Sequence, residues 1–271
     1  MKVLFGTVVY PGAFKYMEDF FDSLEHQTYK DFRLLLISDG VATSDINNVV
    51  TKHNIAVDIV VADEGKTPAK LRVQLLSEAK SRDADVLVLG DIDDTFSENR
   101  VAKVIETFKA NTELGFVYND LLLPDKTVIM PPLQDKTEDI EDILEYNYLG
   151  LSTTAICIGK LTEDYIASLG DCKSFVFDWY LYCRLLLFGL KGARAPKAET
   201  YYRIYDNNFA GVPTSTPENI EKELQVKKNH FDALSKYDDR YKRLLDSYNN
   251  GKYQLIKQER YFWWNLTKEE D

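Results

Sequence analysis

Short apolar segments alternate with helical segments through the first 110 residues of the chain. The predicted strands span residues 2–10, 31–40, 57–63 and 85–91, and the predicted helices span 14–26, 44–53, 67–80 and 97–110. Ser97 is the expected N-cap of the last helix. Alternation of strand and helix is typical of an α/β domain whose sheet is mostly parallel. We therefore predict a mixed, mostly parallel sheet flanked by helices.

The fourth predicted strand leads directly into a group of carboxylates. In the segment VLVLGDIDDTF, residues 86–96, the apolar residues are followed by Asp91, Asp93 and Asp94. Neighbouring carboxylates repel one another, which raises their pKa values unless a positive charge lies between them. A divalent cation is one explanation, because hard cations prefer oxygen ligands. A solvated acidic turn that begins the next helix is the other.

Three of the predicted strands end in polar residues. The first ends at Tyr10, the second at Asp39 and the fourth at Asp91. In open α/β sheets, ligands bind beyond the carboxyl ends of the strands. If these strands are neighbours, their ends form one site, and this favours a ligand over a simple turn.

Charge and motif content argue against several classes of function. The 271-residue chain has a formal net charge of −11, which disfavours non-specific binding to nucleic acid or anionic lipid. It has no GxGxxG after the first strand, no GxxxxGK[ST] and no GxSxG, so a dinucleotide dehydrogenase, a P-loop NTPase and a nucleophile-elbow hydrolase are disfavoured. The histidines His26, His53 and His230 are scattered, which argues against a zinc site and favours structural or solvated roles.

The cellular location and the domain boundary are also expectations from composition. The N-terminal segment is too short and too β-like for a signal peptide, and no apolar run reaches the roughly 18 residues of a membrane span. Three cysteines without metal-ligand spacing indicate reduced thiols, so we expect a cytoplasmic protein. A linker predicted at 211–219 separates a domain at 1–210 from a helical extension at 211–271.

The second half of the chain has a looser pattern. After residue 130 the sequence predicts helices at 137–147, 161–169 and 175–190, strands at 152–159 and 199–208, and two charged helices that break at Asn249-Asn250-Gly251. The aromatic segment RYFWWN, residues 260–265, is expected to pack a C-terminal helix or to form a homodimer contact. A peripheral contact with a membrane surface or with an acceptor remains an alternative for it.

Four segments in residues 1–206 carry a resemblance to one family. They are FFDSLEHQTYKDFRLLLISDG, TPAKLRVQLLSEAKSRDADVLVLGDIDD, FVFDWYLYCRLLLFG and YYRIYDNN. In this order they resemble the uridine-binding strand, the strand that ends in the DxD signature, the helix of the catalytic base and the strand after it in the family 2 glycosyltransferases. The resemblance implies a GT-A fold and a nucleotide-sugar substrate.

The resemblance also implies roles for individual residues. Asp39 falls at the uracil ring, with Val8 and Tyr10 beside the base, and Arg72 falls near the diphosphate. Asp93 is the implied direct metal ligand, and Asp91 is the second acid, which faces the metal and the ribose or sugar. Asp178 falls at the catalytic base. Arg203 and Tyr205 fall in the segment that closes over the nucleotide.

These roles imply a metal-assisted transfer of a sugar from UDP. Mn²⁺ or Mg²⁺ between the two phosphates would neutralise the leaving group. Asp178, with its pKa raised by Phe175, Phe177 and Trp179, would take the proton of the acceptor hydroxyl. One base opposite one leaving group implies inversion at the anomeric carbon. The expected acceptor is a growing polysaccharide, a lipid-linked sugar or a glycoprotein.

Departures from the family pattern leave alternatives open. Phe177, Val73 and Tyr205 replace residues that the family usually has as Glu, Asn and His. A catalytically weak GT-A module that binds a nucleotide-sugar is one alternative, and a nucleotidyltransferase is another. The simpler interpretations of two site residues also remain: Asp39 as a turn former and Asp178 as an ion-pair partner of Arg184.

Overall fold

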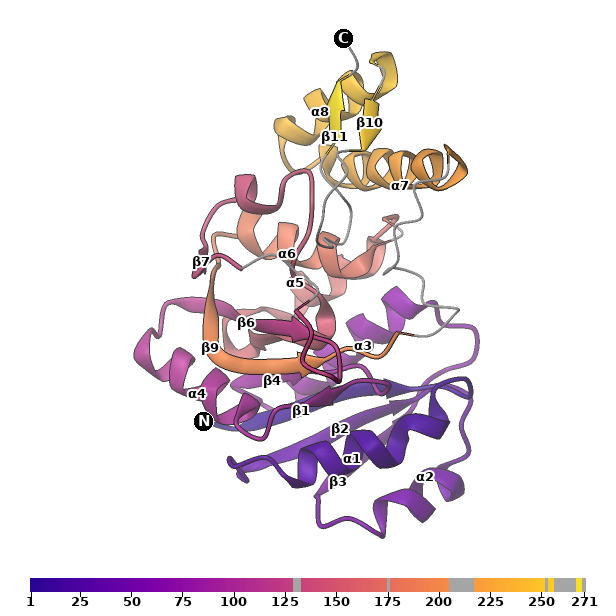
Figure 1. The fold of residues 1–271 in the computed structure, drawn as a ribbon, viewed down its shortest axis with the longest axis vertical. Coiled ribbons are helices and arrows are strands. Elements are labelled where there is room, and N and C mark those ends of the chain that lie inside the picture. Colours follow the sequence, from indigo (N-terminus) through magenta and orange to yellow (C-terminus); the bar gives the residue numbers. More distant parts are fainter. Residues whose placement is uncertain (129–132, 175, 205–216, 252, 256–266, 270–271) are drawn as a thin grey trace. The chain divides into compact units, whose positions relative to one another are not determined.

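The computed structural model describes residues 1–128, 133–174, 176–204, 217–251, 253–255 and 267–269. The chain forms two compact units (Figure 1), and several segments contribute to each. Unit 1 contains residues 1–128, 151–171 and 192–203, and unit 2 contains residues 129–150, 172–191 and 204–271. The boundary predicted at 210 remains a prediction. Phe175, Tyr205, the segment 260–265 and most of the predicted linker lie outside the described residues.

Unit 1 is built on a mixed sheet with the strand order β3-β2-β1-β4-β8-β6-β9-β5. Its strands are β1 (Val3–Val9), β2 (Phe32–Ser38), β3 (Val57–Val61), β4 (Val86–Leu89), β5 (Thr95–Phe96), β6 (Leu114–Leu122), β8 (Thr154–Cys157) and β9 (Lys191–Tyr201). The first four are parallel to one another, whereas β8 is antiparallel to both β4 and β6. The predicted mixed α/β sheet is therefore confirmed.

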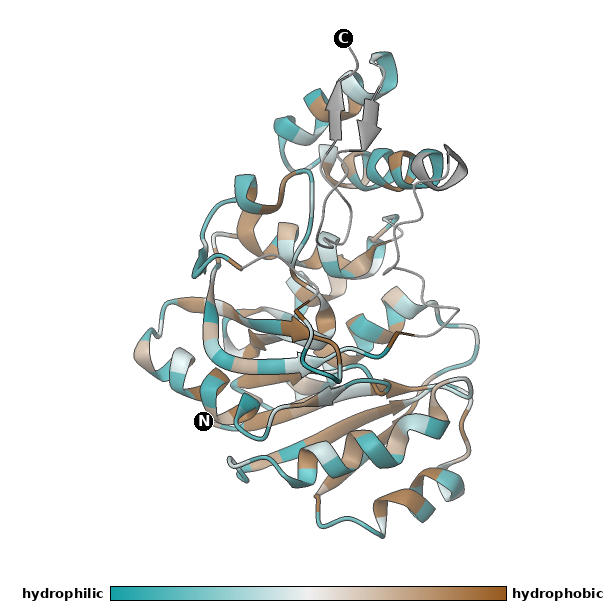
Figure 2. Ribbon diagram, in the orientation of Figure 1, coloured by the Kyte–Doolittle hydropathy of each residue, from teal (hydrophilic) through white to brown (hydrophobic). Residues whose placement is uncertain are grey.

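Helices cover both faces of this sheet. They are α1 (Met17–Glu25), α2 (Thr43–Val50), α3 (Pro68–Ser81), α4 (Arg100–Ala110) and α5 (Glu163–Ser168), with short 3-10 turns η1 (Phe14–Tyr16), η3 (Leu151–Thr153), η4 (Ile158–Lys160) and η5 (Leu169–Asp171). Helices α1, α2 and α4 share one apolar core with Phe5. Helix α3 lies on the other face, where a Cβ at Gly6 would come within 3.0 Å of Leu75. Figure 2 shows the apolar residues of β1 and β2, whereas β9 is largely hydrophilic.

The helical spacing of apolar residues in α1 explains how it packs on the sheet. Met17, Phe20, Phe21 and Leu24 are all buried, as the spacing predicts. Phe20 packs edge-on against Phe5 of β1 at 5.8 Å between ring centroids. Full burial of such a side chain contributes about 1.5–3 kcal/mol, so this face anchors the helix to the sheet.

Some local predictions are wrong. Helix α4 begins at Arg100 rather than near Ser97, because the Ser97 hydroxyl accepts a hydrogen bond from the Glu199 backbone N–H at 3.0 Å instead of capping the helix. The predicted helix at 137–147 is only the 3-10 turn η2 (Ile140–Ile143). Asp139 and Asp142 form a capping box with the backbone of this short turn.

Unit 2 is mainly helical. It contains η2, the short strand β7 (Lys136–Thr137), α6 (Phe177–Leu187), α7 (Pro217–Ser235), α8 (Asp239–Asn250) and a hairpin of β10 (Tyr253–Leu255) with β11 (Thr267–Glu269). The two charged helices predicted near the C-terminus are present, but the break lies before Asp239 and not at Asn249-Asn250-Gly251. Asp238 causes this break, because its carboxylate caps α8 by accepting the Arg240 N–H at 2.8 Å.

The core of unit 2 surrounds Trp179. Its indole Nε1 donates to the carbonyl of Ile143 at 2.7 Å, and the ring of His230 stacks on it at 3.8 Å between centroids. His230 is fully buried, and burial lowers its pKa well below the usual value. Its structural role agrees with the prediction. No helix among the described residues is both long and apolar enough to cross a membrane.

Lys227 makes the stability of unit 2 depend on pH. Its side chain is buried and donates to the Glu145 carbonyl, and burial lowers its pKa from 10.5 to about 8. Below pH 8 the lysine is charged in both the folded and the unfolded chain, so folding bears the full cost of burying the charge. Between pH 8 and 10.5 the unfolded chain binds more protons, so the free energy of unfolding should rise with pH, by roughly 3 kcal/mol in total.

Urea unfolding followed between pH 7.5 and 9.5 measures this dependence. Lys227→Met should abolish the rise with pH, whereas Lys228→Met, which changes the neighbouring lysine of α7, should retain it. An equal pH dependence in both variants would show that the buried ammonium is not its source.

Candidate functional site

The carboxyl ends of β2, β1 and β4 lie side by side. Strand β1 pairs in parallel with β2 and with β4, so Val9 lies opposite Ser38 and Gly6 lies opposite Leu89. The Asp39 N–H donates to the Val9 carbonyl at 2.9 Å, which ties the two strand ends together. Three of the polar ends named from the sequence therefore lie at one edge of the sheet.

The predicted base-binding residues differ in their exposure. Tyr10 follows β1 and is 41% exposed, and Asp39 follows β2 and is half-buried. Val8 is only 5% exposed, and its neighbours along β1 alternate between the two faces of the sheet. Tyr10 and Asp39 thus present side chains at the strand ends, whereas Val8 belongs to the core.

The acidic turn after β4 has a fixed backbone. The Asp94 N–H donates to the Asp91 carbonyl at 3.1 Å, and the Asp91 N–H donates to Ser152 Oγ at 3.1 Å. A Cβ at Gly90 would lie 2.6 Å from Phe96 and 2.7 Å from Phe5, so only glycine fits there. The turn is therefore part of the packed structure and not a loose solvated loop.

Arg72 meets the first acid of this turn. It lies in α3, whose N-terminus is capped by Thr67, and its Nη2 donates to Asp91 Oδ1 at 2.5 Å. Both side chains are largely shielded from water, with 22% and 33% exposure. The basic position expected in the helix before the acidic strand is thus in direct contact with the acidic turn.

Asp94 is the buried acid of the turn. Burial raises its pKa well above the usual range, and the negative charges of Asp93 and Asp91 raise it further. Its Oδ1 accepts the Arg203 backbone N–H at 3.2 Å, while Oδ2 has no hydrogen-bond partner among the described residues. The sequence placed Asp94 in the acidic group without assigning it a role.

Arg203 connects the turn to the beginning of α1. Its Nε donates to the Asp93 carbonyl at 3.1 Å, and its Nη2 donates to Asp19 at 2.6 Å. The guanidinium also lies 4.7 Å from the centre of the Tyr16 ring. The sequence patterns did not predict the contacts of Arg203 with Tyr16 and Asp19.

Arg100 supports the turn from inside the protein. It is fully buried, and its Nη2 donates to the carbonyls of Leu89 and Ser152 at 2.7 and 2.9 Å. Its Nε donates to Asn119 Oδ1 at 2.8 Å. Leu89 precedes the acidic turn, and the Ser152 hydroxyl accepts a hydrogen bond from it. Arg100 therefore fixes the backbone on both sides of the turn. Sequence reasoning missed Arg100 and Ser152, since a buried arginine in a helix has no distinctive local pattern.

Asp178 belongs to unit 2. It lies in the first turn of α6, between the buried side chains of Phe177 and Trp179, and its Oδ1 accepts the Trp179 N–H at 2.7 Å. A carboxylate in the first turn is stabilised by the helix dipole. Arg184, in the same helix, donates to the Tyr180 hydroxyl at 2.7 Å and lies over the Tyr237 ring.

The acidic turn has the donor chemistry of a site for a hard divalent cation. Asp91 and Asp93 offer carboxylate oxygens that are partly exposed, and the buried Asp94 has an unpaired oxygen next to them. Mg²⁺ and Mn²⁺ prefer such ligands and leave positions for substrate phosphates. The residues present therefore fit the cation that the sequence led us to expect.

The fold is shared with solved glycosyltransferases. A mannosyltransferase, PcManGT from Pyrobaculum calidifontis, solved with GDP-Man and Mn²⁺, is 13% identical with a TM-score of 0.55, over 89% of this chain and 64% of its own. S. aureus TarS 1-349, solved with UDP-GlcNAc, is 14% identical with a TM-score of 0.63, over 92% and 72%. GalNAc-T7, solved with UDP, GalNAc and Mn²⁺, is 13% identical with a TM-score of 0.62, over 91% and 50%. The chain thus spans less than two thirds of the first and third of these proteins.

The sheet, the acidic turn and these neighbours define a GT-A glycosyltransferase fold. Residues 7–154, more than half of the chain, match the family described as Glycosyl transferase family 2, and the chain belongs to that family. No curated protein sequence matches it. The family and the fold inferred from the sequence are confirmed.

Proposed function

We propose that the protein transfers a sugar from a UDP-sugar to a hydroxyl group, with a divalent cation and with inversion at the anomeric carbon. The observation that carries this proposal is the meeting of Tyr10, Asp39 and Asp91 at adjacent strand ends. Ligands of open α/β sheets bind at this edge. The solved neighbours that contain UDP, UDP-GlcNAc or GDP-Man support a nucleotide-sugar donor.

Each residue then has a defined task. Asp39 and Tyr10 would hold the base, and Asp91 and Asp93 would hold Mn²⁺ or Mg²⁺, which supplies charge neutralisation for the departing diphosphate. Arg72 now pairs with Asp91, and its guanidinium would turn to a phosphate when the donor binds. Asp178 would accept the proton of the acceptor hydroxyl. The acceptor would be a polysaccharide, a lipid-linked sugar or a glycoprotein, at a cytoplasmic location.

Calorimetric titration of UDP, with and without Mn²⁺, tests the donor site. We expect binding that requires the cation, and Asp93→Ala should weaken it roughly 10- to 100-fold, the scale expected when metal ligation is disturbed. Asp45→Ala removes an exposed carboxylate from α2 and should leave affinity unchanged. GDP serves as the comparison for base preference.

Two outcomes would contradict the proposal. If UDP does not bind under any condition, the strand ends are not a uridine site. If UDP binds equally well to Asp93→Ala in Mn²⁺, the acidic turn does not hold the cation.

A further inference from the structure

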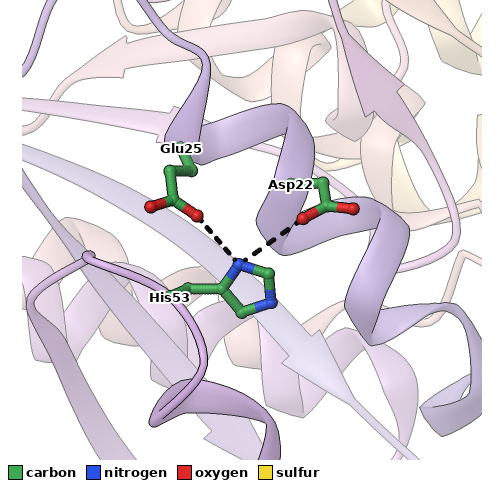
Figure 3. A group of neighbouring side chains, drawn as sticks. All are labelled: Asp22, Glu25 and His53. Atoms are coloured by element: carbon green, nitrogen blue, oxygen red, sulfur yellow. Dashed lines mark hydrogen bonds and ion pairs between the residues drawn. The ribbon is translucent and has the colours of Figure 1, made fainter.

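A second group of metal-ligand side chains lies in unit 1, away from the acidic turn. It consists of Asp22, Glu25 and His53 and is called the His53 cluster here (Figure 3). Asp22 and Glu25 belong to the last turn of α1, and His53 lies between α2 and β3. Because α1 begins near the carboxyl end of β1 and returns along the sheet, the cluster lies at the opposite edge from the strand ends that form the candidate donor site.

The distances from His53 to the two carboxylates are close to those between the ligand atoms of a tetrahedral metal ion. Nδ1 of His53 lies 3.0 Å from Glu25 Oε2 and 3.6 Å from Asp22 Oδ1, and the three ligand atoms lie within 4.8 Å of one another. Zinc bonds to nitrogen and oxygen of about 2.0–2.1 Å place tetrahedral ligand atoms about 3.3–3.4 Å apart. Both His53 distances bracket that separation, so a small shift of the carboxylates would complete the geometry.

The imidazole is already held as a metal ligand would be. The His53 side chain is only 6% exposed, and its ring lies 5.3 Å from the ring of Phe21. Its Nε2 lies 3.2 Å from Glu18 Oε2, and Lys52 also pairs with Glu18. Metal-binding histidines usually direct their second nitrogen to a carboxylate, which fixes the ring and leaves the other nitrogen for the metal. Glu18 would supply that second contact.

The carboxylates around Nδ1 require a proton or a cation on that nitrogen. With Nε2–H donating to Glu18, the lone pair of Nδ1 would face the carboxylates of Asp22 and Glu25 and would be repelled by them. In the part of the chain that the structure describes, neither carboxylate has an ion pair with a lysine or arginine. Both also lie at the end of α1, where the helix dipole disfavours negative charge and the last turn has no basic residue. Either a proton or a cation must occupy this position.

We propose that the His53 cluster binds a divalent transition-metal ion of the zinc class, through His53 Nδ1, Asp22 and Glu25. One histidine and two carboxylates supply three ligands, and water would complete the shell. Glu25 also lines a surface pocket of about 640 Å³ with Lys30, Phe32 and Asn54. The bound ion would join the end of α1 to the segment before β3. Its role is structural, and it is separate from the proposed donor-site cation.

Titration of the 271-residue chain with Zn²⁺ alone, without nucleotide, tests the proposal. The Asp93→Ala variant removes the main ligand of the acidic turn, and we expect it still to bind one equivalent of Zn²⁺ and to melt at a higher temperature when loaded. In that background, Asp22→Asn and Glu25→Gln should each weaken Zn²⁺ binding by at least about 10-fold, and Glu18→Gln by about 10-fold. His26→Gln changes the neighbouring exposed histidine and should have no effect.

The two possible Zn²⁺ sites, the acidic turn and the His53 cluster, predict loss of binding in different variants. Zn²⁺ binding that is lost in Asp93→Ala would place the ion at the acidic turn and overturn the proposal. Binding unchanged by Asp22→Asn and Glu25→Gln, or no binding at all, would overturn it as well, and Nδ1 would then carry a proton in an ion-pair network. His53→Gln tests the histidine ligand directly and should also weaken Zn²⁺ binding. If His53→Gln does not fold, the near-isosteric variants Asp22→Asn and Glu25→Gln still decide whether the cluster binds the ion.

Discussion

Replacement of Asp178 by asparagine is expected to lower the rate of sugar transfer by roughly 10²- to 10⁴-fold, which is the contribution of a general base. UDP affinity should be unchanged, because the side chain has no task in holding the nucleotide. Asparagine keeps the oxygen that accepts the Trp179 N–H, so helix α6 retains its first turn. Transfer rates with saturating donor and acceptor measure the effect, and calorimetry measures UDP binding.

Asp164→Asn is the matched control for Asp178→Asn. Asp164 also lies in the first turn of a helix, α5, and its loss should not alter the rate. An unchanged rate in Asp178→Asn would remove Asp178 from the mechanism. A parallel loss of UDP affinity would instead assign it to donor binding or to the integrity of unit 2.

Replacement of Arg100 by methionine is expected to reduce the free energy of unfolding by at least about 3 kcal/mol. The change leaves the carbonyls of Leu89 and Ser152 and the side-chain oxygen of Asn119 without their donor in the interior. Each buried acceptor left unsatisfied costs about 1–3 kcal/mol. The guanidinium also lies 4.5 Å from the centre of the Phe96 ring, and that contact is lost too. Urea unfolding at constant pH measures the loss.

Two further variants separate the buried contacts of Arg100 from its helix. Lys103→Met lies in the same helix, where Lys103 pairs with Glu106 on the surface, and it should change stability by less than about 1 kcal/mol. Arg100→Lys keeps the charge but loses the planar fork, so we expect a stability between those of wild type and Arg100→Met. Equal stability of Arg100→Met and Lys103→Met would show that the buried network contributes nothing.

The regular part of the fold follows from local patterns. Strands such as Val3–Val9 are continuous apolar runs because both faces of the sheet are covered by helices, and the spacing of Phe20, Phe21 and Leu24 indicates one buried helix face. The errors have distant causes. Ser97 would be an ordinary N-cap by itself, but Glu199, which follows it by 102 residues, takes its hydroxyl.

Some residues of the candidate site could also be predicted from local sequence patterns, and others could not. Tyr10, Asp39 and Asp91 are visible from the sequence because each follows an apolar strand. Arg100 and Ser152 are not, because their partners are backbone groups brought near by folding. The direct contact of Arg72 with Asp91 could be anticipated only through the family resemblance, because a basic residue in a helix is usually a solvated surface group.

The contacts of Arg203 with the acidic turn have a consequence for synthesis on the ribosome. Strands β1 to β4 are complete by residue 89, and a growing chain can pair them early. The backbone N–H that binds Asp94 belongs to a residue 109 positions later in the chain. Translation at about 5–20 residues per second delivers it several seconds after Asp94 itself. In a nascent chain that stops short of residue 203, the sheet would already be paired while its three neighbouring aspartates still lacked one of the groups that hold them in place.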